Sequence, residues 1–218
     1  MRIALLLIAV VLSGCGTTVY LDKLEAPAIG QQPSAPAVGT STTGGDARIV
    51  ANPQNAGSSD RWLRLGRQVP TQPGGGYIGT FTENVTNTKA SVALVGFIPK
   101  ASPIMMTVFF EPKPPAPPAA LLHIDLLPDG RIRINDTTFA GTYKFDTLIG
   151  FSVGFNLAGP APSASVVVRG GGDDAGIDVP ISPNIAQFGL GRVRVFAPFE
   201  GVNAPAGAFF VNEIFASR

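Results

Sequence analysis

The sequence is short of cysteine, histidine and charge, and each shortage excludes a class of protein. Its 218 residues include one cysteine, Cys15, and one histidine, His123. A disulfide within the chain therefore cannot form, and a catalytic triad that needs histidine would have to use His123. Lys and Arg number 16 against 15 Asp and Glu, so the net charge is +1. This balance lacks the basic excess of nucleic-acid binding proteins, and we expect no nucleic-acid partner.

The first segment of the chain is almost free of polar residues. Ile3 to Leu12 is an apolar run, and Arg2 is the one early positive charge. At about 1.5 Å of rise per residue, such a helix is too short to cross a hydrocarbon core of about 30 Å, so it is a poor permanent span. The run fits the apolar region of a secretory signal instead. We predict a signal peptide over residues 1–14.

The stretch from Leu12 to Cys15 resembles the lipobox of bacterial lipoproteins. The small residues Ser13 and Gly14 directly precede the only cysteine. The resemblance implies that the chain is cut before Cys15, that its thiol receives a diacylglycerol, and that its new amine is acylated. Two or more acyl chains form a stable anchor. Gly16 stands where an Asp would favour the inner membrane, so the resemblance implies a cell-envelope protein on the outer membrane, with membrane lipid as a partner through Cys15.

Large apolar side chains are scarce in residues 15–59, which are rich in Gly, Ser, Thr, Ala, Pro and Gln. Such a segment buries too little surface to offset the entropy of ordering it. We therefore predict a lipidated cysteine followed by a disordered, flexible tether, which leaves residues 60–218 as the folded domain. The alternative is that Ala47 to Ala51 adds an edge strand to that domain.

Residues 60–218 lack a clean helical stripe, and Gly and Pro break their apolar runs at short intervals. This pattern predicts an all-β fold, a single antiparallel β-sandwich or jelly roll. Val92 to Ile98 is almost wholly apolar, which predicts a central strand covered on both faces. Leu148 to Leu157 alternates large apolar residues with Gly, Ser and Asn, which predicts one apolar face and one nearly bare face.

A hairpin is predicted from Leu121 to Asn135. Pro128-Asp129-Gly130 fits a three-residue loop in which Gly130 takes the left-handed position. In the register that follows, Leu126 faces Ile132 and Ile124 faces Ile134 on the core side.

The other side of this hairpin carries a polar ladder, which is the candidate ligand-binding site. Its members are His123, Asp125, Arg131, Arg133 and Asn135. In the predicted register Asp125 faces Arg133, and His123 faces Asn135. One interpretation is a solvated outer face with a cross-strand pair of less than about 1 kcal/mol. The other is a surface that contacts the hydroxyl groups of a glycan.

The second half of the domain resembles the concanavalin-like and laminin-G-like jelly rolls. Gly141 to Thr147 reads Gly-x-Tyr-x-Phe-Asp-Thr and leads into the long strand from Leu148, and a later strand runs from Ser165 to Gly170. The chain then closes with the strand Phe209 to Ile214. The resemblance covers Leu121 to Arg218 and implies a jelly roll whose last strand completes a sheet. The Trp often found before the long strand is replaced by Leu148 and Ile149.

The sequence offers little for catalysis. A strand with the closely spaced carboxylates of a retaining glycosidase is missing. Jelly-roll polysaccharide lyases resemble one another in a Gln-x-His strand with a nearby Tyr; here Leu121 takes the place of Gln, and Tyr143 is the comparable phenol. We expect no metal and no cofactor beyond the covalent lipid on Cys15.

We therefore predict a lipid-anchored envelope protein whose sandwich is a non-catalytic binding module for glycan or peptidoglycan. A first alternative is a structural subunit that docks on an envelope protein complex through an apolar face or the Pro112 to Pro118 loop. A second is a polysaccharide lyase built around His123 and Tyr143.

Overall fold

A computed structural model describes most of the predicted domain and part of the predicted tether. The described residues are 17–22, 24, 28–33, 41–43, 46–67, 74–116, 119–136, 138–172, 175–198 and 206–218. The predicted signal peptide and Cys15 lie outside them. None of the helices in these ranges has the length and hydrophobicity needed to cross a membrane.

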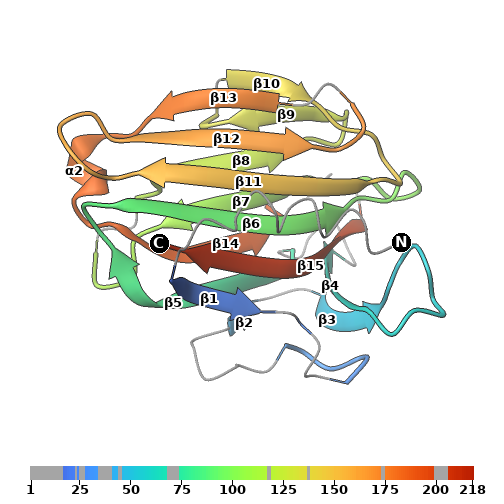
Figure 1. The fold of residues 1–218 in the computed structure, drawn as a ribbon. Coiled ribbons are helices and arrows are strands. Elements are labelled where there is room, and N and C mark those ends of the chain that lie inside the picture. Colours follow the sequence, from blue (N-terminus) through green and yellow to red (C-terminus); the bar gives the residue numbers. More distant parts are fainter. Residues whose placement is uncertain are drawn as a thin grey trace.

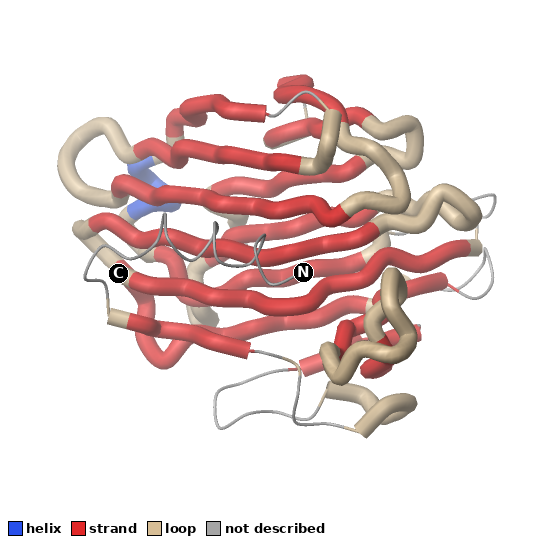
Figure 2. Tube along the Cα trace, turned by 45° about the vertical axis from the view of Figure 1, so that its right-hand side comes forward, coloured by secondary structure: helices blue, strands red, loops and turns tan. Residues whose placement is uncertain are grey.

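The described residues form fifteen strands in two antiparallel sheets that are stacked face to face (Figures 1 and 2). The strands of the eight-stranded sheet are, in spatial order, β13 (Ala175–Pro180), β12 (Ser163–Arg169), β11 (Leu148–Asn156), β6 (Lys89–Phe97), β15 (Gly207–Ser217), β4 (Arg61–Arg67) and β3 (Asp46–Ala51), with β1 (Thr18–Asp22) also paired to β15. Those of the seven-stranded sheet are β10 (Thr138–Thr142), β9 (Arg131–Ile134), β8 (Leu122–Leu126), β7 (Met106–Glu111), β14 (Leu190–Phe196), β5 (Gly76–Val85) and β2 (Ser41–Thr43). A short helix, α2 (Pro183–Ala186), precedes β14. The all-β sandwich predicted from the sequence is confirmed.

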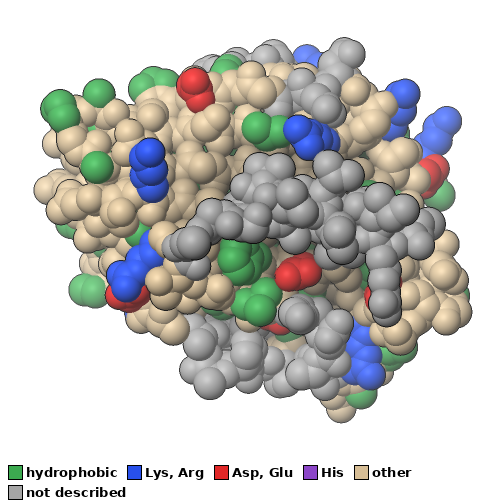
Figure 3. All heavy atoms as spheres, viewed as in Figure 1, with side chains coloured by type: hydrophobic (Ala, Val, Ile, Leu, Met, Phe, Trp, Pro, Cys, Tyr) green, Lys and Arg blue, Asp and Glu red, His purple; other side chains and the backbone are tan. Residues whose placement is uncertain are grey.

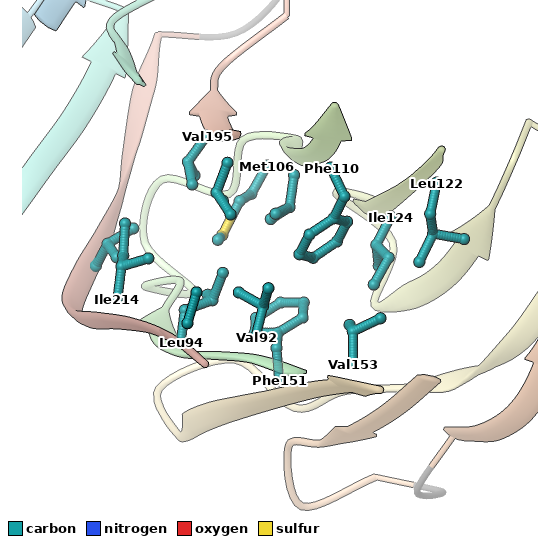
Figure 4. Packing of buried hydrophobic residues seen from close by; sticks show 14 of the residues in the cluster. Val92, Leu94, Met106, Phe110, Leu122, Ile124, Phe151, Val153, Val195 and Ile214 are labelled. Atoms are coloured by element: carbon teal, nitrogen blue, oxygen red, sulfur yellow. The ribbon is translucent and has the colours of Figure 1, made fainter. Parts of the chain in front are cut away.

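The core lies between the two sheets because alternate side chains of each strand point inward. Figure 4 shows Phe151, Val153 and Leu94 of the eight-stranded sheet facing Phe110 and Ile124 of the seven-stranded sheet. The rings of Phe110 and Phe155 also meet across the layers, with centroids 5.4 Å apart. The strand predicted from Val92 is central as expected, since β6 pairs with β11 on one side and β15 on the other.

The hairpin has the predicted register. Leu126 pairs with Ile132, Ile124 pairs with Ile134, and all four side chains are buried. Gly130 has a φ of 88°, and the N–H of Leu127 donates to the carbonyl of Arg131 at 2.9 Å. The turn chemistry and the apolar alternation therefore agree in this part of the chain.

The prediction of a flexible tether over residues 15–59 was wrong for the strands that this segment contains. β1 pairs with the second half of β15, β3 pairs with β4, and β2 pairs with β5. β3 includes the Ala47 to Ala51 edge strand that was the alternative. Composition failed as a guide because an edge strand gains its backbone hydrogen bonds from a neighbour and needs few large apolar side chains.

A buried polar network ties β1 to the seven-stranded sheet. The Tyr20 and Tyr77 hydroxyl groups share a hydrogen bond, and the Tyr77 O–H also donates to Asp22 Oδ2 at 2.5 Å. Burial raises the pKa of the Tyr77 phenol, so it stays a neutral donor. The Tyr20 ring stacks on Phe81 at 5.6 Å between centroids and passes directly over Gly79.

Replacing Gly79 with alanine should detach β1. A Cβ built at Gly79 would lie 2.7 Å from the Tyr20 ring, which is fixed by its hydrogen bond and its stacking. We expect Gly79→Ala to lower the free energy of unfolding by about 1–3 kcal/mol. Urea titration followed by circular dichroism measures this.

The matched control is Gly154→Ala in β11. No heavy atom lies within 4 Å of a Cβ at Gly154, so the substitution should be neutral or slightly stabilising. Equal unfolding free energies for the two variants would contradict the packing of Tyr20 on Gly79.

Candidate binding face of the seven-stranded sheet

The predicted pair of Asp125 and Arg133 forms the centre of a row across three strands. Thr107, Asp125 and Arg133 lie opposite one another on β7, β8 and β9. Arg133 donates to Asp125 Oδ2 from Nε at 2.9 Å and from Nη2 at 2.7 Å, and Thr107 Oγ1 lies 2.6 Å from Asp125 Oδ1. The Asp125 side chain is only 4% exposed, so its charge is compensated within the row. This is a tighter pair than the solvated one that the sequence favoured.

His123 occupies the next position on β8, beside an aromatic ring. Its imidazole stacks on Phe109 of β7 with centroids 5.0 Å apart, and Nε2 lies 3.2 Å from Asp136 Oδ1. The His123 N–H donates to Asn135 Oδ1, and the Asn135 N–H donates to the His123 carbonyl, each at 3.1 Å. Asn135 has a φ of 49°, so it ends the ladder as well as facing His123. The predicted pairing of these two residues is therefore present.

Arg131 lies apart from the row, although it was predicted to belong to the ladder. Its guanidinium contacts Asp129 in the turn, with Nε to Oδ2 at 2.7 Å, and half of its side chain is exposed. The hydrogen bond from Arg131 holds the pKa of the Asp129 carboxyl below its usual range. The hairpin loop draws Arg131 toward Asp129 because the two residues are neighbours in the turn.

β7 and β14 supply the other half of this face, and none of their residues was among the predicted site residues. Phe109 stacks on Phe196 at 5.4 Å, and the Arg194 guanidinium lies 4.7 Å from the Phe109 centroid and 5.1 Å from that of Phe196. The buried carboxylate of Glu111 accepts from Arg192 Nε at 2.6 Å and from Arg194 Nη2 at 2.7 Å. The signal was available, because both strands alternate these residues with inward Val108, Phe110, Val193 and Val195.

Together these side chains form one surface, which we call the mixed face. Its members are Thr107, Phe109, Glu111, His123, Asp125, Arg133, Asp136, Arg192, Arg194 and Phe196. Its three guanidinium groups are balanced by three carboxylates, so it has no strong potential of one sign. What it offers is a set of oriented donors and acceptors beside partly exposed aromatic rings.

His123, Asp125 and Asp136 place one possible metal-ligand atom each within 4.8 Å of one another. Both oxygens of Asp125 already accept hydrogen bonds, one from Thr107 and the other from Arg133. A cation would have to displace the Arg133 guanidinium, whose positive charge already occupies the position. The three residues therefore fit an ion-paired network better than a metal centre.

The pair required by the lyase hypothesis is separated. The Tyr143 hydroxyl donates to the Leu127 carbonyl at 2.5 Å, beyond the far end of β8 from His123. Four residues of extended chain between Leu127 and His123 span about 13 Å. Burial also raises the pKa of the Tyr143 phenol, so the phenolate that would act as the base is scarcely populated near neutral pH. A proton-transfer site made of His123 and Tyr143 is therefore not assembled.

Comparison with solved structures shows the fold class. Over 92% of this chain and 98% of the other, the structure is similar to lectin I from Ulex europaeus, solved with the methyl glycoside of α-L-fucose, at a TM-score of 0.56 and 12% identity. Lectin II from Ulex europaeus gives a TM-score of 0.55 at 9% identity, over 92% of this chain and 99% of that chain. Winged bean acidic lectin, solved with methyl-α-D-galactose, gives 0.54 at 9% identity, over 91% and 98%.

These similarities identify a lectin-like, concanavalin-like jelly roll, as the sequence resemblance implied. The chain also aligns over 72% of its length with only 15% of a sialidase, at 13% identity and a TM-score of 0.48. No family model and no curated protein sequence matches the chain.

Removing the Asp125 carboxylate should be costly. Asp125→Ala would leave Arg133 and Thr107 without their shared acceptor on a buried site. We expect a loss of about 2–4 kcal/mol in the free energy of unfolding, as for other broken buried pairs.

Asp129→Ala is the control, because it removes a carboxylate from an exposed pair with Arg131. Its effect should stay below about 1 kcal/mol. Urea titration of both variants tests the difference, and a small loss in Asp125→Ala would contradict the buried row.

Proposed function

We propose that this protein is a lipid-anchored, non-catalytic glycan-binding module of the cell envelope, and that the mixed face contacts the glycan. The observation that carries the proposal is the continuous run of His123, Phe109 and Phe196 beside paired arginines and carboxylates. Peptidoglycan and envelope polysaccharides are the expected ligands.

The mixed face matches the chemistry of a sugar ring. A pyranose has an apolar side of C–H groups that packs on aromatic surface, and hydroxyl groups around its edge that donate and accept hydrogen bonds. Phe109 and Phe196 offer the first kind of contact. Arg194, Arg133 and Asp136 offer charged partners, whose hydrogen bonds are stronger than those between neutral groups. The balanced charge favours neutral or zwitterionic sugars over highly charged polymers.

The fold likeness is consistent with this function. Ulex europaeus lectin I was solved with a fucose glycoside and winged bean acidic lectin with a galactose glycoside. We transfer from them only the expectation that a sandwich of this kind can present a sugar site. The contact residues come from the mixed face of this chain.

Glycan binding should depend on Phe196. Phe196→Ala removes one ring of the stack and one of the two rings beside Arg194, while every side chain that pairs with Asp125 or Glu111 is kept. We expect binding to isolated sacculi or to a responsive polysaccharide to weaken at least about fivefold, equivalent to about 1 kcal/mol. Binding of the mature protein in detergent micelles is measured by pull-down and by titration.

Phe215→Ala is the matched control, because Phe215 is partly exposed on the outer face of the other sheet. It should bind like the wild type. Equal losses in both variants, or no saturable binding by the wild type across the panel, would refute the assignment of the mixed face.

Lipidation should depend on Cys15. Mature protein should carry three acyl chains on residue 15 and should enter the detergent phase of a Triton X-114 extraction. Cys15→Ser should remain in the aqueous phase, and mass spectrometry should show no lipid on it. A wild-type protein with a free Cys15 thiol would contradict the anchor.

A further inference from the structure

We propose that the outer face of the eight-stranded sheet is a membrane-contact surface. Outward side chains from β1, β3, β4, β6, β11 and β15 form what we call the apolar strip: Leu21, Val50, Trp62, Val95, Phe97, Leu148, Phe210 and Phe215. Its partner is the boundary between headgroups and acyl chains of the bilayer that holds the protein. The proposal rests on the lipid anchor at Cys15, and goes beyond glycan binding.

The first step is that the anchor point is fixed to the sandwich. The Thr17 N–H donates to the Arg218 carbonyl at 2.8 Å, and the Arg218 N–H donates to the Thr17 carbonyl at 3.0 Å. Cys15 is two residues before Thr17, which is at most about 7 Å of chain. A lipid on Cys15 therefore brings the end of β15 against the membrane, with no long spacer between them.

The second step is the content of the strip. The rings of Phe97 and Phe210 lie 5.9 Å apart, and Leu21, which is 42% exposed, lies opposite Phe215. The described hydrophobic residues that pack on Trp62, Val95 and Phe97 all belong to the same sheet: Val50, Leu148 and Phe210. This explains the sequence of β6, which was apolar enough to predict cover on both faces. Trp62, Val95 and Phe97 are buried, Phe210 and Phe215 are partly exposed, and Asn212 and Glu213 lie between these two on β15. Apolar side chains on an outer face beside a lipidated end are the kind that membranes cover.

The third step is the polar rim of the strip. Trp62 Nε1 is buried without a hydrogen-bond partner among the described residues. On the neighbouring outward positions, Arg48 Nε lies 3.2 Å from Asp46, and Arg64 pairs with the same carboxylate, so two guanidinium groups share one negative charge. Indole N–H groups and arginines are the groups that proteins place at the headgroup level. Lipid phosphates would accept hydrogen bonds from the indole N–H of Trp62 and from the guanidinium groups of Arg48 and Arg64.

The fourth step is the limited extent of the strip. Toward β12 the outward positions become small or polar, at Gly150, Ser152, Gly154 and Ser165. Figure 3 looks onto this face and shows hydrophobic side chains over β15 and the end of β1. Phe210 is seven residues from Ser217, or about 24 Å along an extended strand. The lipid on Cys15 at one end of β15 and the Phe210 ring toward the other end would together fix the orientation of the domain on the membrane.

The test uses Trp62, which is the only tryptophan in the chain. Mature lipidated protein is reconstituted into vesicles of phosphatidylethanolamine and phosphatidylglycerol, with or without bromine on the acyl chains. Bromine quenches indole fluorescence only at close range. We expect brominated vesicles to reduce the Trp62 emission by a third or more. Leu21→Asp should lower that quenching at least twofold, because it places a charge on the exposed part of the strip.

The controls separate this proposal from the others. Phe196→Ala, on the opposite sheet, should lose glycan binding and keep the quenching. Protein that floats with the vesicles but shows unchanged Trp62 emission would overturn the membrane contact while leaving the anchor intact. The same unquenched emission in a stable dimer would assign the strip to a second copy of the chain. Protein that fails to float would remove the anchor and this proposal together.

Discussion

The alternation of side chains along a strand governs the whole molecule. Each strand of a two-layer sandwich commits every second residue to the shared core, so Phe110, Ile124 and Phe151 have no other place to go. The side chains that can contact a ligand or a partner therefore lie on the two outer faces, which point in opposite directions. A ligand bound to one face and a membrane in contact with the other would not compete, because the core separates the two faces.

The two outer faces differ in the kinds of side chain that they carry. On the seven-stranded sheet, charged groups on β7, β8, β9 and β14 are partnered across the strands, and Asp125 and Glu111 are buried beneath longer side chains. On the outer face of the eight-stranded sheet, aromatic and aliphatic side chains lie around β15, and small residues occupy the outward positions of β11 and β12. The carboxylates of Asp125 and Glu111 are held by hydrogen bonds within the protein, which orients the donors and rings beside them for a ligand.

How far the sequence predicts this structure depends on the signal in each segment. The hairpin from Leu121 to Asn135 was predictable to the residue because turn chemistry and alternation point to one register. β13 begins at Ala175 after a stretch rich in Gly and Asp and was not predicted, since an edge strand needs little local signal when a neighbour supplies the ladder. β1 was not predicted from the sequence for the same reason. Its burial depends on Tyr77, far away in the chain, and no local pattern reveals such a partner.

The sequence predicted only part of the candidate site. His123, Asp125, Arg133 and Asn135 could be placed together because one hairpin holds them. The alternation along β7 and β14 places Phe109, Arg194 and Phe196 on the outward side of their strands. Sequence alone does not bring the two strands together, because β7 pairs with β14 across a long separation, with Glu111 and Arg194 83 residues apart. Pairings of this kind are fixed by topology, which periodicity alone does not encode.

The central position of β15 has a consequence for biogenesis. β15 follows every other strand in the chain, yet it pairs with β6, β4 and β1 in the middle of the eight-stranded sheet. Until it is added, β6 and β4 have no common neighbour, β1 has no partner in this sheet, and the sheet remains in three parts. A nascent chain without β15 cannot complete this sheet, since its longest-range contacts form last. The order of the strands along the chain therefore delays completion of the eight-stranded sheet until β15 is available.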